Sequence, residues 1–403
     1  MLRGLRASGP GELFVACCTL LGCLALIGAV TQGSYSPWWL LLSVPLAAFS
    51  CIEIIGFFRF PPRAEGAAAT SAPAAAVAEA GRPGTPVRWQ LRIGGPLRDS
   101  SPVVADGRLY IGSWDHHLRA VDTASGRQLW QLKTGHAVDS SPAVADGTVY
   151  VGSWDHHLWA VDAATGEHRW KLRTGDRVRS DPVVADGTVY VGSNDGHLWA
   201  VDAASGRPRW KFPTGSPIRS APAVADGSVY VGGNDGQLWA VDAASGERRW
   251  QLKTLSGLWS SPAVADGIVY VGSADRHLWA VDAATGVELW RVPTRTWVKS
   301  SPVVADGRVH FGTSDGHLWA VDAVTGEQRW RRRIGRWVRF RPTVADGTLY
   351  VGTDDRQVWA VDAATGEQRW RITAGRPVRC SPAVVDDVVY VADYQGQLSA
   401  LQS

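Results

Sequence analysis

Histidines recur at the same position of a repeated 40-residue unit, and imidazole is a common metal ligand. Five of them are spaced by 40 residues or a multiple of 40: His117, His157, His197, His277 and His317. The ligands of one zinc ion must come within about 2.0–2.3 Å of it. We expect equivalent histidines of successive units to point into different sectors of the molecule. They therefore predict no metal site.

Acidic residues repeat in the same manner. Asp106, Asp146 and Asp186 fall at one position of the unit, and Asp122 and Asp162 fall at another. General acid–base catalysis needs two titratable groups whose environments differ, whereas these carboxylates occur in near-equivalent copies. The sequence thus predicts no catalytic residue and no bound cofactor.

The positions of the cysteines and the net charge argue against two further classes, disulfide-stabilised proteins and nucleic-acid-binding proteins. Cys380 is the one cysteine of the repeats, and the other four lie in an apolar amino-terminal region. This distribution argues against a disulfide framework. With 41 basic and 38 acidic residues, the formal net charge of +3 gives no reason to expect a nucleic-acid partner.

Two apolar runs precede the repeats. Residues 13–30 contain no charged residue, and residues 38–58 contain only Glu53. Each run is long enough to cross about 30 Å of hydrocarbon as a helix. We predict a transmembrane hairpin over residues 13–60 after a short basic segment, 1–12. A cleaved signal peptide or a lipoprotein signal ending at Cys23 is the alternative for the first run.

Arginines flank this hairpin on both outer sides. Arg3 and Arg6 precede it and Arg59 and Arg63 follow it, while the connecting loop has no basic residue. The positive-inside rule then places both flanks, and the repeats, on the cytoplasmic side of the cell membrane. Residues 61–86 are rich in alanine and proline without apolar periodicity, which predicts a linker.

The rest of the chain repeats with a fixed period. Prolines from Pro102 to Pro382 and tryptophans from Trp130 to Trp370 each recur every 40 residues. A period near 40 is typical of a propeller or a solenoid, whose units bury their apolar faces by stacking on one another.

Each unit contains four strand-sized segments separated by turn residues such as Asp146-Gly147, a strong hairpin signal. Residues 87–93 supply one extra strand before the first unit, and the last unit ends at Ser403 after three. The two chain ends should complete one shared blade, which removes the open edge. We predict an all-β, eight-bladed propeller of four-stranded antiparallel blades over residues 87–403.

The segment from Ala160 to Trp170 reads AVDAATGEHRW and resembles the tryptophan-docking motif of quinoprotein-type propellers, the PQQ-like repeat family. The resemblance implies that each tryptophan packs between adjacent blades and that Asp162 and Thr165 fix the turn. Seven tryptophans then have a structural docking role: Trp130, Trp170, Trp210, Trp250, Trp290, Trp330 and Trp370.

The family includes quinoprotein alcohol dehydrogenases and a non-enzymatic lipoprotein scaffold of outer-membrane β-barrel assembly. The dehydrogenases hold their quinone with a vicinal disulfide and metal ligands that usually lie in blade insertions. This chain has no insertions, and its adjacent cysteines, Cys17 and Cys18, fall in the first apolar run. The resemblance therefore implies the non-enzymatic branch, with a quinone-dependent dehydrogenase as the alternative.

The units differ mainly in two classes of loop, those that lead into each repeat proline and those between the second and third segments. Up-and-down strands place both classes on one face, which we call the variable face. Tryptophan, tyrosine and arginine are typical interface anchors. The candidate binding residues on this face are Arg179, Arg219, Trp259, Trp297, Lys299, Trp337, Arg339, Arg379, Trp114, Trp154 and Tyr394.

These patterns favour a membrane-anchored scaffold or sensor without catalytic activity. We expect the variable face to bind a protein or peptide partner, or a small anionic ligand attracted by its basic residues. An envelope-assembly scaffold is the alternative function. Alternatively, the loops have no binding role and their sequences drifted after duplication because packing does not constrain them.

Overall fold

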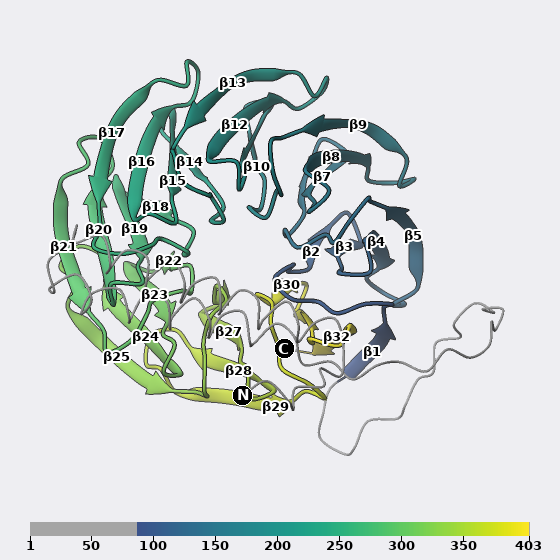
Figure 1. Cartoon of the computed structure of the whole chain (residues 1–403). Coiled ribbons are helices and arrows are strands. Elements are labelled where there is room, and N and C mark those ends of the chain that lie inside the picture. Colours follow the sequence, from purple (N-terminus) through teal and green to yellow (C-terminus); the bar gives the residue numbers. More distant parts are fainter. Residues whose placement is uncertain (1–86, 403) are drawn as a thin grey trace, which may run out of the picture. The chain divides into compact units, whose positions relative to one another are not determined.

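The computed structural model describes residues 87–402, and its regular elements are β-strands. They form eight separate four-stranded sheets, arranged as blades around a common axis (Figure 1). The predicted eight-bladed propeller is confirmed. The predicted basic segment over residues 1–12, the hairpin over residues 13–60 and the linker over residues 61–86 all lie outside the described residues. Within residues 87–402, no helix could span a membrane.

In each blade the four strands follow one another from the axis outward. The innermost strands are β2 (Val103–Ala105), β6 (Ala143–Ala145), β10 (Val183–Ala185), β14 (Ala223–Ala225), β18 (Ala263–Ala265), β22 (Val303–Ala305), β26 (Thr343–Ala345) and β30 (Ala383–Val385). The second strands are β3 (Arg108–Gly112), β7 (Thr148–Gly152), β11 (Thr188–Gly192), β15 (Ser228–Gly232), β19 (Ile268–Gly272), β23 (Arg308–Gly312), β27 (Thr348–Gly352) and β31 (Val388–Ala392).

The third strands are β4 (His117–Asp122), β8 (His157–Asp162), β12 (His197–Asp202), β16 (Gln237–Asp242), β20 (His277–Asp282), β24 (His317–Asp322), β28 (Gln357–Asp362) and β32 (Gln397–Gln402). The outermost strands are β5 (Gln128–Lys133), β9 (His168–Arg173), β13 (Pro208–Pro213), β17 (Arg248–Lys253), β21 (Glu288–Pro293), β25 (Gln328–Arg333), β29 (Gln368–Thr373) and, in the eighth blade, β1 (Val87–Arg92).

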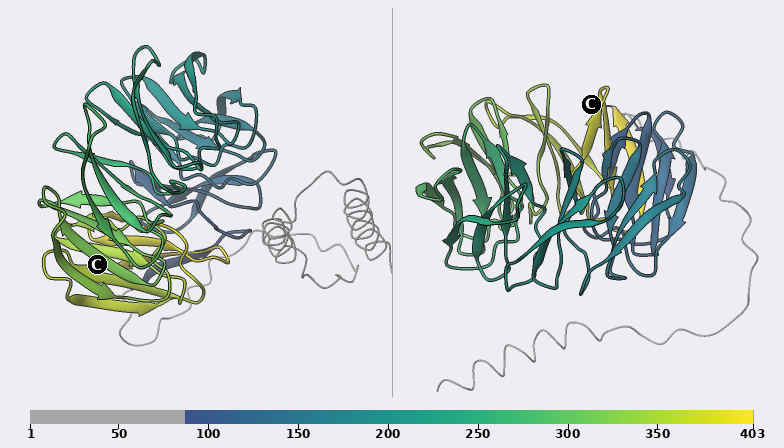
Figure 2. Two further views of the ribbon diagram at one scale, coloured as in Figure 1. Left: turned by 60° about the vertical axis from the view of Figure 1, so that its left-hand side comes forward. Right: turned by 90° about the horizontal axis from the view of Figure 1, so that it is seen from above.

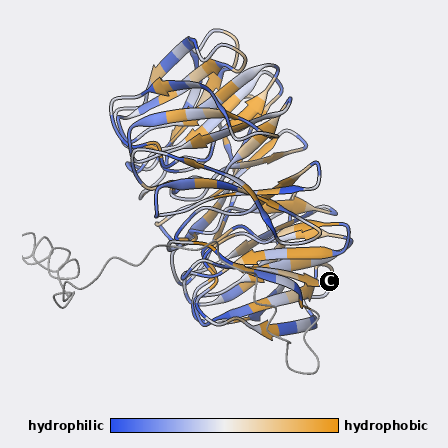
Figure 3. Cartoon of the chain, turned by 90° about the vertical axis from the view of Figure 1, so that its right-hand side faces the viewer, coloured by the Kyte–Doolittle hydropathy of each residue, from blue (hydrophilic) through white to orange (hydrophobic). Residues whose placement is uncertain are grey.

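Burial follows the position of a strand in its blade. All five residues of β7 are buried, whereas the outermost strand β9 shows exposed residues on one side. Apolar residues therefore gather in the middle strands, and polar residues gather in the loops at both ends (Figure 3). The first hairpin turns at an Asp-Gly pair in seven blades and at Asp386-Asp387 in the eighth. Asp146 and Gly147 have φ of 47° and 66°, which suits a type I′ turn.

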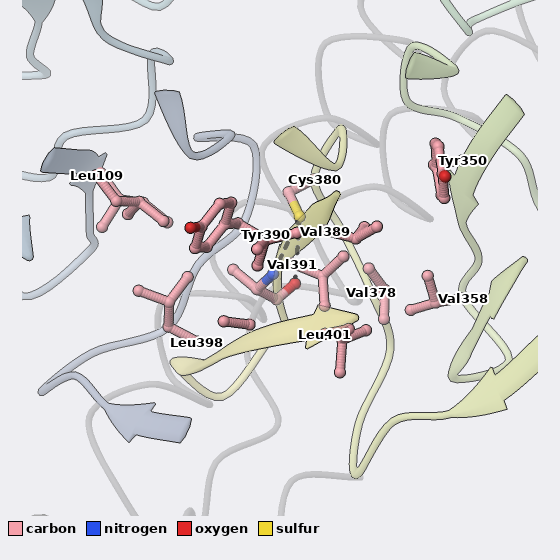
Figure 4. Packing of buried hydrophobic residues seen from close by; sticks show 14 of the residues in the cluster. Leu109, Tyr350, Val358, Val378, Cys380, Val389, Tyr390, Val391, Leu398 and Leu401 are labelled. Carbon is pink, nitrogen blue, oxygen red and sulfur yellow. Dashed lines mark hydrogen bonds between the residues drawn. The ribbon is translucent and has the colours of Figure 1, made fainter. Parts of the chain in front are cut away.

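The last blade joins the two ends of the described chain. Strand β1 pairs antiparallel with β32, so that Trp89 faces Ala400. Buried residues of β31 and β32 fill the centre of this blade (Figure 4). Cys380 belongs to this cluster, its Sγ lies 3.3 Å from the Ala392 amide nitrogen, and burial raises the pKa of its thiol to about 12. The predicted closure by a shared blade is confirmed.

Adjacent blades are joined by a repeated clamp on one carbonyl oxygen. The Ala203 oxygen accepts hydrogen bonds from the Trp170 indole at 3.0 Å and from the Tyr150 hydroxyl at 3.1 Å, both in the preceding blade. Gly206 lies against the indole, where a Cβ atom would come within 2.6 Å of the ring, and its φ is 72°. The same indole bond is made by Trp130, Trp210, Trp250 and Trp330, whereas the Trp290 indole nitrogen has no hydrogen-bond partner among the described residues.

Removing one clamp should destabilise the ring. Trp210→Ala deletes the 3.0 Å bond to the Ala243 oxygen and leaves a void between blades, so we expect the free energy of unfolding to fall by about 3–5 kcal/mol. Trp337 is 42% exposed on a loop, and Trp337→Ala should cost much less. Thermal or urea unfolding of both variants measures this; equal losses would contradict the distinction between docking and surface tryptophans.

Candidate binding face

The two variable loop classes do share one face of the propeller, as their backbone bonds demonstrate. The Trp154 amide, between the second and third strands of blade two, donates to the Ala137 oxygen in the loop that enters that blade, at 2.9 Å. The remaining loops pair on the opposite face, where the Ala163 amide donates to the Gly147 oxygen, also at 2.9 Å. Figure 2 shows both ends of the blades from the side.

The residues three positions before each repeat proline form a ring around the axis on the variable face, which we call the upper tier. Its members are Asp99, Asp139, Arg179, Arg219, Trp259, Lys299, Arg339 and Arg379. Arg179 is neutralised within it, since its Nη2 lies 3.0 Å from Asp99 Oδ2 and 3.1 Å from Asp139 Oδ2. Arg379 pairs with Asp354 at 3.1 Å.

The other three cations of the upper tier have a different environment. Within residues 87–402, no carboxylate forms an ion pair with Arg219, Lys299 or Arg339. Burial lowers the pKa of all three, and neighbouring cations lower it further, while Asp99 and, for Arg339, Asp354 act in the opposite direction from beyond ion-pair distance. The upper tier therefore carries uncompensated positive charge on the side of blades four, six and seven.

Aromatic rings hold two of these cations. Lys299 Nζ lies 4.1 Å from the ring centre of Trp259 and 4.8 Å from that of Trp297. The guanidinium of Arg339 lies 3.6 Å from the ring centre of Trp337. Such cation–π contacts fix a positive charge in place without neutralising it. The Lys299 ammonium and the Arg339 guanidinium thus both keep their charge for an anion.

The predicted aromatic residues of the second loop class serve the packing of the face. Trp114 and Trp154 meet edge to face at 4.9 Å, and the Trp114 indole donates to Asp139 Oδ1 at 2.7 Å. Tyr394 lies 4.9 Å below the Arg379 guanidinium. All three are only partly exposed, so the structure brings them to the variable face but engages them in internal contacts.

A second ring, which we call the lower tier, is formed by the residues immediately before each repeat proline: Ser101, Ser141, Asp181, Ala221, Ser261, Ser301, Arg341 and Ser381. Backbone amides of this tier donate to the side chain of the next blade, as from Ser101 to Ser141 Oγ at 3.0 Å and from Ser141 to Asp181 Oδ1 at 2.6 Å. The sequence reasoning missed this tier as a unit, although its departures from serine are visible in the repeats.

The repeated histidines and aspartates have local roles. His157 Nδ1 lies 2.8 Å from the Asp155 carbonyl oxygen of its own loop. Asp162 accepts a bond from Arg169 at 2.7 Å and two from loop amides, which hold the pKa of that carboxyl well below its usual range. Within the described part of the chain, no three histidine, cysteine or acidic side chains are grouped to hold a metal ion.

Comparisons with known proteins identify the architecture. A model of the PQQ-like repeat family described as outer membrane protein assembly factor BamB matches residues 74–180, 173–261, 253–336 and 333–403. BamB from Moraxella catarrhalis is similar in structure, with TM-score 0.69, 19% identity, and 79% of this chain and 99% of that chain covered. No curated protein matches the sequence.

Two other solved structures are similar. The computationally designed Ika8 protein gives a TM-score of 0.70 at 18% identity, over 77% of this chain and 98% of that one. The quinohemoprotein alcohol dehydrogenase ADHIIG from Pseudomonas putida HK5 gives 0.65 at 17% identity, over 78% of this chain and 76% of that one. At these identities the likenesses show the fold alone.

The dehydrogenase likeness raises the question of a quinone cofactor. In residues 87–402 Cys380 is the single cysteine, so a vicinal disulfide cannot form there. The same part of the chain lacks a group of candidate metal ligands. The residues present do not fit a metal-bound quinone, and we derive no chemistry through one.

Asp181 should make stability depend on pH. Burial raises its pKa to about 7, whereas an aspartate of the unfolded chain ionises near about 3.9. Its contribution to stability is therefore complete below pH 4 and is lost as the pH rises through 7. Asp181→Ser and Asp181→Asn should therefore gain stability over the wild type as the pH rises from 4 to 8, by up to about 4 kcal/mol, since one pKa unit corresponds to about 1.4 kcal/mol. Urea unfolding measures this, and parallel pH profiles would contradict it.

Proposed function

The chain belongs to the PQQ-like repeat family described as outer membrane protein assembly factor BamB, and on this premise we propose that it is a non-catalytic scaffold whose variable face binds an acidic protein segment. The observation that carries the proposal is the uncompensated charge of Arg219, Lys299 and Arg339 in the upper tier. A partner that brings carboxylates to this face would neutralise it.

Exposed apolar side chains border these cations. Leu255, Trp297 and Trp337 are 79%, 48% and 42% exposed, and they lie on the loops that enter blades five, six and seven. Large apolar side chains next to arginine are typical of the energetic centre of an interface. An acidic segment that also carries apolar residues would match both features.

The properties of the opposite face also favour the variable face as the one that binds a partner. Its hairpins carry an aspartate in every blade, from Asp106 to Asp386, and its loop sequences hardly change between repeats. The docking-loop aspartates on this face are already paired with arginines, as Asp162 is with Arg169. A face whose loops repeat in this way and are fixed by inter-blade packing offers little to distinguish one partner from another. We therefore assign recognition to the variable face.

We further propose that residues 13–60 anchor the chain in the cell membrane, with the propeller on the cytoplasmic side as the flanking arginines indicate. An envelope-assembly scaffold is the second candidate, favoured by the family's description. In either case the propeller would hold its partner near a bilayer.

Charge reversal on the upper tier should abolish partner binding. Lys299→Glu with Arg339→Glu should weaken binding of a labelled oligoglutamate peptide containing one leucine at least about tenfold, because attraction becomes repulsion. Fluorescence anisotropy measures the affinity. The matched control is Arg331→Glu with Arg371→Glu, since those side chains stack on Trp319 and Trp359. Equal losses in both pairs would show a nonspecific charge effect and remove the proposal.

The side of the membrane can be tested with a tag fused at Ser403. A cytoplasmic propeller predicts that the tag is protected from protease in intact cells and cleaved once they are opened. Cleavage in intact cells would overturn the argument from the flanking arginines and support the envelope-assembly candidate.

A further inference from the structure

The third strand carries a large side chain near its middle in every blade except the eighth. Six blades have a tryptophan there: Trp159, Trp199, Trp239, Trp279, Trp319 and Trp359. Each of them packs against the preceding blade, as Trp359 does in one cluster with Leu318 of blade six. Blade one has Arg119 at this position, whereas blade eight has Ser399. Blade eight thus lacks the side chain that fills this position elsewhere.

The surroundings of Trp159 in blade two show which residues enclose the indole. The Lys171 Nζ atom lies 4.9 Å from the indole ring centre, and the centre of the His157 ring lies 6.2 Å from it. The indole nitrogen donates to Asp155 Oδ2 at 3.1 Å. The equivalent residues of blade eight are Gln90, Gln397 and Gln395.

These three glutamines line a cavity of about 250 Å³ in blade eight. Its other lining residues are Arg92 on β1, Asp393 after β31, and Gly375 and Arg376 in the loop that enters this blade. Gln90 Nε2 donates to Ser399 Oγ at 3.3 Å, so the cavity adjoins the serine that replaces the indole. Both of its loops belong to the variable face, and β1 places the cavity at the outer edge of the propeller.

A backbone amide in the wall of this cavity lacks the partner that it has in other blades. In blade two the Gly135 amide donates to Asp155 Oδ2 at 2.9 Å. Gln395 replaces that aspartate in blade eight, and within residues 87–402 the Gly375 amide has no hydrogen-bond acceptor. The cavity therefore offers one backbone donor to a ligand.

Asp393 supplies an acceptor without a partner. Its Oδ1 atom accepts the amides of Gln395 and Gln397 at 2.9 and 3.0 Å. Its Oδ2 atom lies on the side of Gly375, 3.7 Å from where a Cβ atom of that residue would stand, and no donor of the described residues bonds to it. The residue is only 6% exposed. Because buried carboxylate oxygens are normally hydrogen-bonded, this one suits a positively charged ligand group.

The charged residues of the wall are two cations and one anion. Within residues 87–402, Arg92 and Arg376 form no ion pair, and Asp393 forms none either. A ligand that complements this set carries two carboxylates and one ammonium group. Guanidinium groups bind carboxylates through two parallel hydrogen bonds, and an ammonium group has three donors and no acceptor, which matches the Asp393 oxygen.

We propose that this cavity binds a small amino acid with an acidic side chain. Its ammonium group bonds to Asp393, and its two carboxylates bond to Arg92 and Arg376, with the Gly375 amide as a further donor. The glutamines close the wall where an indole lies in the other blades. This site goes beyond the proposed function and is separate from it, since Arg219, Lys299 and Arg339 belong to blades four, six and seven.

Three probes test the charge assignment. Isothermal titration of the full-length chain in detergent is carried out with L-glutamate, with L-glutamine, which lacks one carboxylate, and with N-acetyl-L-glutamate, which lacks the ammonium group. L-Glutamate should bind at least about tenfold more tightly than either, because each of the others leaves one charged group of the wall without its partner. Absence of L-glutamate binding, or equal affinity for all three, would overturn the proposal.

Ser399→Trp tests the position of the site. It restores the residue of six other blades, and its indole should occupy the space beside Gln90 and pack against blade seven as Trp359 packs against blade six. L-Glutamate binding should fall at least about tenfold, while the melting temperature without ligand stays equal or rises. Wild-type affinity in a folded Ser399→Trp variant would refute the site.

Arg376→Ser tests the charge without filling the cavity. Serine stands at this position in blades four and five, as Ser216 and Ser256, so the fold should tolerate it. Binding of L-glutamate should weaken at least about tenfold. Arg336→Ser is the matched control, because Arg336 has the same position in the loop that enters blade seven, where Trp359 is present. Equal losses in the two variants would show a general effect of charge and remove the site.

The outcomes separate this inference from the proposed function. The Lys299→Glu and Arg339→Glu pair should lose the acidic peptide and still bind L-glutamate, whereas Ser399→Trp should lose L-glutamate and still bind the peptide. If no variant or wild type binds L-glutamate while the peptide binds as expected, the scaffold proposal stands and the cavity site is wrong. The reverse result removes the scaffold proposal and leaves the cavity site.

Discussion

The carbonyl oxygen that receives both a tryptophan and a tyrosine from the preceding blade is the contact on which the ring depends. A blade buries its two middle strands only when neighbours cover them, and this oxygen fixes how each neighbour sits. The indole occupies the space over Gly206 and its equivalents, where any side chain would collide. Register, spacing and the tilt of one blade on the next are thus set by one small group of atoms repeated around the axis.

The shared carbonyl oxygen constrains the loops on the face opposite the variable face and leaves the loops of the variable face free to change. The docking loops must keep their aspartate, their glycine and their length, because they carry the shared carbonyl. The loops that enter each blade are held by backbone bonds such as the one from Trp154 to Ala137, which accept any side chain. Charge and aromatic residues could therefore accumulate on the variable face at little cost to the fold.

Much of this architecture could be predicted from the sequence, since the 40-residue period, the Asp-Gly turns and the half-blade at each end determine an eight-bladed ring. The residues of the candidate binding face were predicted as a set, but the ion pairs among them were not. Arg179 and Arg379 appear as free cations in the sequence, whereas Asp99, Asp139 and Asp354 partly neutralise them. Arg219, Lys299 and Arg339 differ because no carboxylate of residues 87–402 comes within ion-pair distance of them, which depends on loop geometry that the repeat pattern does not specify.

Pairing of β1 with β32 has a consequence for the order in which the protein can be made. Arg88 and Gln402 bond across 314 positions of the chain, so β1 is made long before its partner β32. Until β32 is made, each completed blade can stack on its predecessor, but β1 lacks the strands that complete its blade. Ring closure therefore has to wait for β32, and the interval before it leaves an unpaired strand open to wrong partners.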